Sequence, residues 1–227
     1  MKLITVAGPP SSGKTTVLTK VMEHLMLRNH VGVVKMDCLA TTDGLIYEKK
    51  GIPVKVGLSG GICPDHFFAA NIEDIVRWGQ RSELDYLITE SAGLCNRCSP
   101  HIKGVLAVCV VDHLSGVDTP KKIGPMLKFA DLIVITKGDI VSQAEREVFT
   151  FRVRQANLTA DIIHVNGITG QGAAELARLF SNAPSTDSVT NKRLRFTMPA
   201  ALCSYCLGET EIGKNYQIGN IKTMNWE

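Results

Sequence analysis

The segment at residues 8–15, GPPSSGKT, constrains this chain most, because it matches the phosphate-binding pattern G-x-x-x-x-G-K-[ST]. An apolar stretch at residues 2–7 precedes it, and residues 15–28 carry apolar side chains at helical spacing. This context predicts a strand that turns into a helix, whose first N–H groups hold a polyphosphate. Lys14 is expected to neutralise the β- and γ-phosphates, and the Thr15 hydroxyl to bind Mg²⁺. The predicted nucleotide-binding set at this turn is Gly8, Ser12, Gly13, Lys14, Thr15 and Thr16.

Strands and helices are expected to alternate along the chain. Continuously apolar runs at residues 31–36, 85–89, 104–111 and 132–135 are typical of parallel strands covered on both faces. The sequence therefore predicts an α/β fold, a P-loop NTPase with a mostly parallel sheet flanked by helices. We expect a turn-rich loop at residues 59–66, a helix from about residue 71 to 81 and a single helix over residues 120–129.

Composition sets the wider limits. A length of 227 residues suits one α/β domain at 1–182, a Pro/Ser/Thr-rich linker at 183–191 and a Cys-bearing C-terminal appendage at 192–227. The net charge of +3 gives no reason to expect nucleic acid. The apolar run at 105–111 is too short for membrane insertion, and the chain starts on a strand without a secretory signal, so we expect a cytoplasmic protein.

The segment TKGD at residues 136–139 resembles the guanine-recognition motif N-K-x-D, with Thr136 in place of Asn. A carboxylate at Asp139 can accept from two N–H donors that guanine has and adenine lacks. The stem of Lys137 would lie along the base. GTP is therefore favoured over ATP.

Two acidic residues, Asp37 and Glu90, each end a predicted core strand beside the phosphate loop. They are the groups expected to hold Mg²⁺ or orient water for hydrolysis, with Lys14 as the third member of the catalytic set. Glu90 begins an E-x-x-G segment, in which the amide of Gly93 would face the γ-phosphate. The sequence predicts a nucleoside triphosphatase.

Seven cysteines in a chain expected to be cytoplasmic suggest metal or redox work. Cys95 and Cys98 form a C-x-x-C pair just after Glu90, and Cys63 or His66 could complete a tetrahedral site within the chain or across a dimer. Such ligands suit Zn²⁺, Ni²⁺, Cu⁺ or an iron–sulfur cluster. A second pair, Cys203 and Cys206, fits a structural zinc staple and a functional metal site equally well.

The ordered set of motifs resembles the P-loop GTPases that insert nickel into urease and hydrogenase. The resemblance covers about residues 1–181 and runs through GPPSSGKTT, VVKMD, TTDGLIYEKKGIP, SGGICPDH, ITESAGLCNRCSPH and VNGITGQG. It implies a GTP-dependent homodimer with a metal ion between protomers. Cys63 and His66 fall where urease-type proteins have Cys-Pro-His, with Asp65 inserted here, and Cys98 falls near a cysteine of the hydrogenase type. The tail at 192–227 has no counterpart in this resemblance.

These observations lead to one favoured hypothesis and one alternative. The favoured hypothesis is a GTP-hydrolysing metallochaperone that uses GTP and Mg²⁺, binds a transition metal through Cys and His near the nucleotide, and delivers it to a client metalloenzyme or its assembly factors. The alternative is a nucleotide-driven iron–sulfur protein for electron transfer or reductive activation. A small-molecule kinase is disfavoured, since it leaves TKGD and the C-x-x-C pair unexplained.

Overall fold

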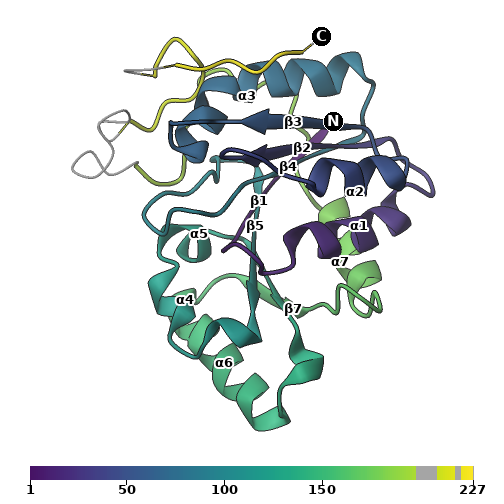
Figure 1. Ribbon diagram of the computed structural model, residues 1–227, viewed down its shortest axis with the longest axis vertical. Coiled ribbons are helices and arrows are strands. Elements are labelled where there is room, and N and C mark those ends of the chain that lie inside the picture. Colours follow the sequence, from purple (N-terminus) through teal and green to yellow (C-terminus); the bar gives the residue numbers. More distant parts are fainter. Residues whose placement is uncertain (198–208, 218–220, 227) are drawn as a thin grey trace.

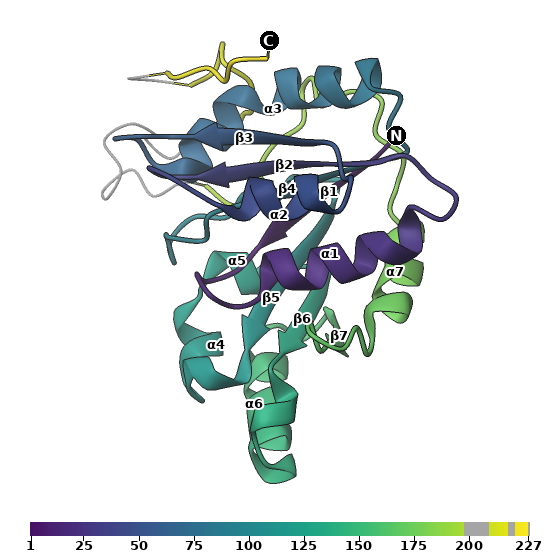
Figure 2. The ribbon, with the colours of Figure 1, turned by 45° about the vertical axis from the view of Figure 1, so that its right-hand side comes forward.

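A sheet of seven parallel strands forms the centre of the computed structural model, which describes residues 1–197, 209–217 and 221–226. Over those residues the strand order is β3-β2-β4-β1-β5-β6-β7 (Figures 1 and 2). The predicted α/β fold with a parallel sheet is confirmed. The strands are β1 (Lys2–Ala7), β2 (Val31–Asp37), β3 (Val54–Leu58), β4 (Tyr86–Glu90), β5 (Leu106–Asp112), β6 (Leu132–Thr136) and β7 (Asp161–His164).

Helices cover both faces of the sheet. One face packs against α1 (Lys14–Leu25), α2 (Asp43–Lys49) and α7 (Ala173–Ser181), through a core cluster that includes Leu18, Tyr47 and Phe180. The other packs against α3 (Pro64–Arg81), α4 (Thr119–Lys122), α5 (Pro125–Lys128) and α6 (Gln143–Ala156). Two short 3₁₀ turns, His113–Ser115 and Gly138–Ile140, follow β5 and β6.

The central strand β1 is continuously apolar because both of its faces are covered by helices. Ile4 and Val6 face the α1 side, while Leu3 faces α3, and all three are fully buried. Side chains of a strand alternate between faces, so a strand covered on both faces needs apolar residues at successive positions. Because all the strands of this sheet are parallel, their carboxyl ends meet at one edge, and the motifs that follow them gather there.

Helix α3 begins earlier than expected. The predicted helix started near residue 71, but α3 starts at Pro64, with Cys63 as its N-cap residue. Proline is well suited to the first helical position, because that N–H has no partner within the helix. Consequently Asp65 and His66 lie in the first helical turn, although the sequence predicted a turn-rich loop over residues 59–66.

The predicted single helix over residues 120–129 is two short helices. Gly124 breaks it, with a positive φ of 63°, and Pro125 starts α5. A Cβ at Gly124 would lie 2.6 Å from the carbonyl oxygen of Asn96, so this break brings α5 against the loop that carries the C-x-x-C pair.

The C-terminal residues pack on the α3 side of the sheet, where the last described segment runs along α3 (Figure 1). Leu194, Ile212 and Met224 join the same core cluster as α3. Asn71 of α3 donates to the carbonyl oxygen of Lys222 and accepts from the amide of Met224. The division into a domain, linker and appendage stays a prediction, and Cys203 and Cys206 lie outside the described residues.

Candidate functional site

The turn between β1 and α1 has the backbone geometry of a phosphate-binding loop. Gly13, the N-cap of α1, has a φ of 91° in the left-handed region, and a Cβ at Gly8 would lie 2.1 Å from the carbonyl oxygen of Val110. Glycine is needed at both positions. The Lys14 ammonium donates to the carbonyl oxygens of Gly8 and Pro9, at 2.8 and 2.9 Å. Burial lowers the pKa of Lys14 to about 8, although the nearby Glu90 carboxylate opposes that shift.

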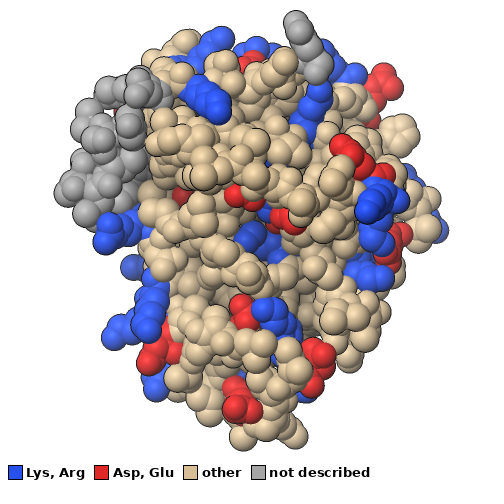
Figure 3. All heavy atoms as spheres, viewed as in Figure 1, with Lys and Arg blue, Asp and Glu red and all other residues tan. Residues whose placement is uncertain are grey.

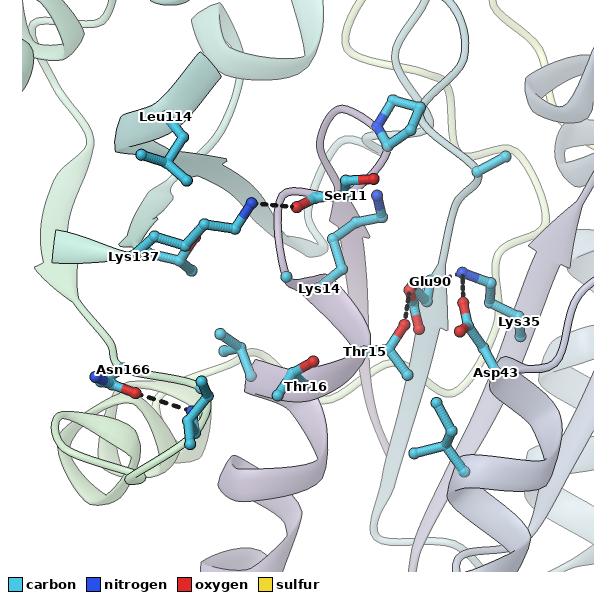
Figure 4. Close-up of a pocket in the computed structure, with 18 of the residues that line it drawn as sticks. Ser11, Lys14, Thr15, Thr16, Lys35, Asp43, Glu90, Leu114, Lys137 and Asn166 are labelled. Carbon is cyan, nitrogen blue, oxygen red and sulfur yellow. Dashed lines mark hydrogen bonds and ion pairs between the residues drawn. The ribbon is translucent and has the colours of Figure 1, made fainter. Parts of the chain in front are cut away.

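A cavity of about 730 Å³ opens beside this turn and extends along the carboxyl edge of the sheet (Figure 4). Side chains of both charges line it, and acidic and basic groups lie close together in the middle of the same face (Figure 3). The lining draws on the P-loop, β2, α2, the segment after β4 and the loops after β5, β6 and β7. Its members include Lys14, Thr15, Thr16, Lys35, Asp37, Asp43, Glu90, Lys137, Asp139, Asn166 and Ile168.

Glu90 is the centre of a polar network at the phosphate end of the cavity. Its side chain is fully buried, and its Oε1 accepts from the Thr15 hydroxyl at 2.8 Å and from the Lys35 ammonium at 2.8 Å. Its Oε2 accepts from the Tyr47 hydroxyl at 2.6 Å. The Lys35 ammonium also contacts Asp43 Oδ2 at 2.6 Å (Figure 4).

Charge pairing sets the ionisation of this network. Burial acts to lower the pKa of Lys35, but the Glu90 charge and the hydrogen bond to Asp43 outweigh it, so the pKa is raised. Burial acts to raise the pKa of Asp43, and the Lys35 ammonium more than compensates, so that pKa is lowered. Burial beside Glu90 holds the pKa of Tyr47 well above its ordinary value. The network therefore contains a charged lysine, an ionised Asp43 and a neutral tyrosine that donates a hydrogen bond to Glu90.

Gly93 brings the segment after Glu90 into direct contact with the P-loop. Its φ is 71°, and a Cβ there would lie 1.7 Å from the Gly8 carbonyl oxygen. The amide of Ser91 donates to the carbonyl oxygen of Val6, which continues the pairing of β4 with β1 past the end of the strand. The segment after Glu90 is thereby packed directly against the P-loop.

The base-recognition segment is tied to the same loop. The Thr136 hydroxyl donates to the Ser12 carbonyl oxygen at 2.7 Å, so threonine in place of asparagine keeps a hydrogen bond to the P-loop. The Lys137 ammonium contacts the Ser11 carbonyl oxygen at 2.7 Å and the Asp112 carboxylate at 3.3 Å. Lys137, Asp139 and Ile168 line the far end of the cavity from Glu90.

A thiol cluster lies where the loop after β4 meets the first turn of α3. One ligand atom from each of Cys63, Asp65 and Cys98 lies within 4.8 Å of the other two. Among the described residues, this is the group of three such side chains close enough together to hold one metal ion. The Cys95 sulfur lies 3.3 Å from the Cys98 sulfur. Zinc–thiolate bonds of about 2.3 Å place the sulfurs of a tetrahedral site roughly 3.8 Å apart, so the spacing suits one small ion.

The ionisation of this cluster favours metal binding. The hydrogen bond from Cys98 lowers the pKa of Cys63 to about 6 despite burial, with help from the amides of His66 and Asp65 at the start of α3. The same contact, together with burial, raises the pKa of Cys98. Burial and the Cys63 charge raise the pKa of Asp65 to about 8. A thiolate is the form that coordinates metals, and a cation here would release the remaining protons.

Three residues near these sites have other surroundings than the thiol cluster. His66 is fully buried in α3 and is not part of the three-residue group found in the described residues. Cys38 donates to the carbonyl oxygen of Gly60 at 3.2 Å. Asp37 accepts from the amide of Cys38 through Oδ1, with its Oδ2 at 4.0 Å from the Lys35 ammonium.

Sequence reasoning missed four residues that the structure brings into these sites, Asp65, Lys35, Asp43 and Tyr47. Asp65 was visible only as an insertion in a motif. Lys35 was a charged residue inside an otherwise apolar strand, which is a signal that the residue has a buried partner. No comparable signal marked Tyr47 or Asp43, whose positions depend on how α2 packs.

Fold and site together define a P-loop nucleoside triphosphatase of the GTPase kind. The chain matches the family described as CobW/HypB/UreG, nucleotide-binding domain, over residues 2–164, and it belongs to that family. This agrees with the resemblance drawn from the motifs. Among the described helices, none is long and apolar enough to cross a membrane.

One similar protein matches this chain over nearly its whole length, and another matches about two thirds of it. An uncharacterised protein of Methanocaldococcus jannaschii is 46% identical over 226 residues, which is 99% of this chain and 97% of the relative. The urease accessory protein UreG of Aliarcobacter butzleri is 27% identical over 161 residues, 66% of this chain and 81% of that protein.

Two solved structures share the fold. HypB from Helicobacter pylori in complex with nickel has a TM-score of 0.66 at 20% identity, with 83% of this chain and 91% of that chain covered. The hydrogenase maturation factor HypB from Archaeoglobus fulgidus has a TM-score of 0.63 at 22% identity, with 80% and 89% covered.

Proposed function

We propose that this protein is a GTP-hydrolysing metallochaperone, which binds Ni²⁺ or Zn²⁺ beside the nucleotide and delivers it to a client metalloenzyme or its assembly factors. The observation that carries the proposal is the short segment from Glu90 to Cys98. One end of that segment is buried against Thr15 of the P-loop, and the other end places Cys98 within reach of Cys63 and Asp65. The two sites therefore share one continuous piece of backbone.

In this proposal the nucleotide site works mainly by positioning. The N–H groups at the start of α1 and the Lys14 ammonium hold the β- and γ-phosphates. Mg²⁺, held by Thr15 with Asp37 or Glu90, would neutralise phosphate charge. Glu90 or Asp37 orients the attacking water, while Asp139 and Lys137 hold the guanine base. The fit is supported by the oxygen ligands around Thr15, which are the kind that Mg²⁺ prefers.

Hydrolysis is coupled to metal release through Gly93. Its contact with Gly8 is tight enough that a Cβ has no room, so loss of the γ-phosphate would move the backbone that leads to Cys95 and Cys98. Cys63 and Asp65 stay on α3, which the C-terminal residues hold in place. Separation of the two halves of the ligand set would then open the metal site.

Three further parts of the proposal have no support from the described residues. The homodimer with the ion between protomers rests on the family, whereas the role of Cys203 and Cys206 as ligands rests on their C-x-x-C spacing and the cytoplasmic location on the sequence pattern. The nickel-bound relative supports Ni²⁺ as the first ion to test. His66, buried in the first turn of α3, stays a predicted ligand.

The test is metal content of anaerobically purified full-length protein, with and without GTP and Mg²⁺. We expect Ni²⁺ or Zn²⁺ to bind stoichiometrically in wild type and to be lost in the double variant Cys95→Ser, Cys98→Ser, which should still bind GTP. Cys38→Ser is the matched control, because it removes a thiol outside the cluster. Full metal binding by the double variant would refute the site, and a brown protein containing iron and sulfide would favour the iron–sulfur alternative.

A further inference from the structure

Lys35 is an unusual residue for the interior of a parallel sheet. It lies in β2 with only 3% of its surface exposed, and the parallel register places it directly opposite Glu90 of β4. Both side chains point to the sheet face covered by α1 and α2, where the ammonium reaches Glu90 Oε1 at 2.8 Å and Asp43 Oδ2 at 2.6 Å.

Oxygen ligands surround that ammonium on several sides. Asp37 Oδ2 lies 4.0 Å from it, and the Thr15 hydroxyl donates to the same Glu90 Oε1 that Lys35 contacts. Three carboxylates from β2, α2 and β4 thus converge around one cation. Glu90 is the fully buried member of this group, and a buried carboxylate requires a positive partner.

Lys35 is the lysine whose ammonium directly contacts the Glu90 carboxylate. Lys14 is the other lysine near Glu90, but its ammonium donates to the carbonyl oxygens of Gly8 and Pro9. The charge of Glu90 is therefore balanced at close range by Lys35, while Tyr47 satisfies the second carboxylate oxygen.

The oxygens that hold Lys35 overlap with those expected to hold Mg²⁺. The proposed function places Mg²⁺ on Thr15 with Asp37 or Glu90, and the Lys35 ammonium lies 4.0 Å from the first carboxylate and 2.8 Å from the second. Mg²⁺ requires oxygens at about 2.0–2.1 Å in octahedral geometry. An ammonium and a magnesium ion cannot occupy the same oxygen set, because they would be like charges a few ångströms apart.

We propose that Lys35 is a built-in competitor of Mg²⁺, an internal cation that must leave the oxygens of Glu90 and Asp43 before the divalent ion is bound. This inference rests on the magnesium site of the proposed function. Free Mg²⁺ then gains little by binding alone, since it must displace a charge already in place. With a nucleotide present, phosphate oxygens add ligands and negative charge, so the exchange becomes favourable. Lys35 thereby makes Mg²⁺ binding conditional on the nucleotide.

The first test measures Mg²⁺ binding by isothermal titration calorimetry on the full chain without nucleotide. Wild type should show no saturable binding at low millimolar Mg²⁺, whereas Lys35→Met should bind at least about tenfold more tightly, because the competing charge is gone. Lys49→Met is the matched control, since it removes the same charge from an exposed position of the neighbouring α2 and should behave as wild type. Lys35→Arg should also resemble wild type. Equal or weaker Mg²⁺ binding by Lys35→Met would overturn the proposal.

A second measurement uses wild type and remains informative if Lys35→Met does not fold. The ¹⁵Nζ resonance of Lys35, assigned with Lys35→Arg, should shift when the β,γ-imido analogue of GTP is added with Mg²⁺ and remain nearly unchanged with the analogue in EDTA. An identical spectrum under both conditions would contradict the exchange.

The affinity of wild type for the same analogue, with and without Mg²⁺, distinguishes a failure of the proposed magnesium site from a failure of the Lys35 competition. If Mg²⁺ does not tighten analogue binding, the magnesium site and the Lys35 inference both fail. If Mg²⁺ does tighten it and neither Lys35 measurement responds, the Lys35 inference alone fails. The metal content of the cysteine cluster tests the metallochaperone function independently of both.

Discussion

His101 offers a quantitative test of how the loop after β4 is held to the sheet. It is fully buried, with Nδ1 3.0 Å from the Thr5 hydroxyl in β1 and Nε2 3.0 Å from the Met126 carbonyl oxygen in α5. A carbonyl only accepts, so Nε2 carries the proton and Nδ1 accepts from Thr5. The neutral ring therefore satisfies both contacts. Burial accordingly lowers the pKa of His101 to about 4, in spite of the Met126 carbonyl and with a further contribution from Arg195.

This shift makes stability depend on pH in a defined direction. The folded pKa is lower than the ordinary value of 6.5, so the unfolded chain takes up the proton first as the pH falls. The contribution of His101 is complete above about pH 6.5 and is lost between about pH 6.5 and pH 4. Linkage between those two pKa values gives a loss of about 2 kcal/mol in the free energy of unfolding between pH 7.5 and pH 5.

The assay is urea denaturation of wild type and His101→Gln at several pH values in that range. His101→Gln should be less stable at pH 7.5, but its free energy of unfolding should fall by about 2 kcal/mol less than that of wild type on going to pH 5. His24→Gln, at an exposed position of α1, is the control and should follow wild type. Parallel pH profiles for wild type and His101→Gln would refute the reasoning.

Three other predictions concern the nucleotide site and the C-terminal packing. Gly93→Ala should lower the GTP hydrolysis rate at least about tenfold, because a Cβ would lie 1.7 Å from the Gly8 carbonyl oxygen, and an unchanged rate would show that this contact is dispensable. Asp139→Asn should weaken GTP and strengthen xanthosine triphosphate in competition binding, since an amide donates where the carboxylate accepts, and unaltered base preference would remove Asp139 from base recognition. Arg195→Met should lower the free energy of unfolding by about 2 kcal/mol in urea titrations, because it removes bonds to Asp131 and to the carbonyl oxygens of Ile102 and Val105; stability equal to wild type would mean that those groups find other partners.

The sequence indicated the fold through local rules that need no knowledge of distant contacts. Continuous apolar runs identified the parallel strands, and the glycine-rich turn between residues 2–7 and 15–28 identified the P-loop. Because parallel strands end at one edge, the positions of Glu90, Lys137 and Asp139 near a shared cavity could be anticipated from strand ends alone.

The remaining features depend on packing between segments. Lys35 faces Glu90 because of the register between β2 and β4, which the sequence does not encode in any local pattern. Asp65 joins the thiol cluster because α3 begins at Pro64, whereas the preceding glycines at residues 60–61 suggested a longer loop. A proline before an acidic first turn is a helix-start signal that could have found this boundary.

Residues 90–98 contact the P-loop at one end and carry thiols at the other, which has a consequence for how such proteins diversify. Residues 90–93 are constrained by the P-loop, since Glu90 bonds Thr15 and Gly93 touches Gly8. The thiols come later in the loop and from the separate start of α3. In the proposed function, the residues that would select the metal ion therefore differ from those that bind the nucleotide, and residues 90–98 connect the two sets. Under the proposed function, exchange of the cysteine ligands alone, by mutation in a laboratory or over evolutionary time, would change the bound ion and leave the nucleotide site intact.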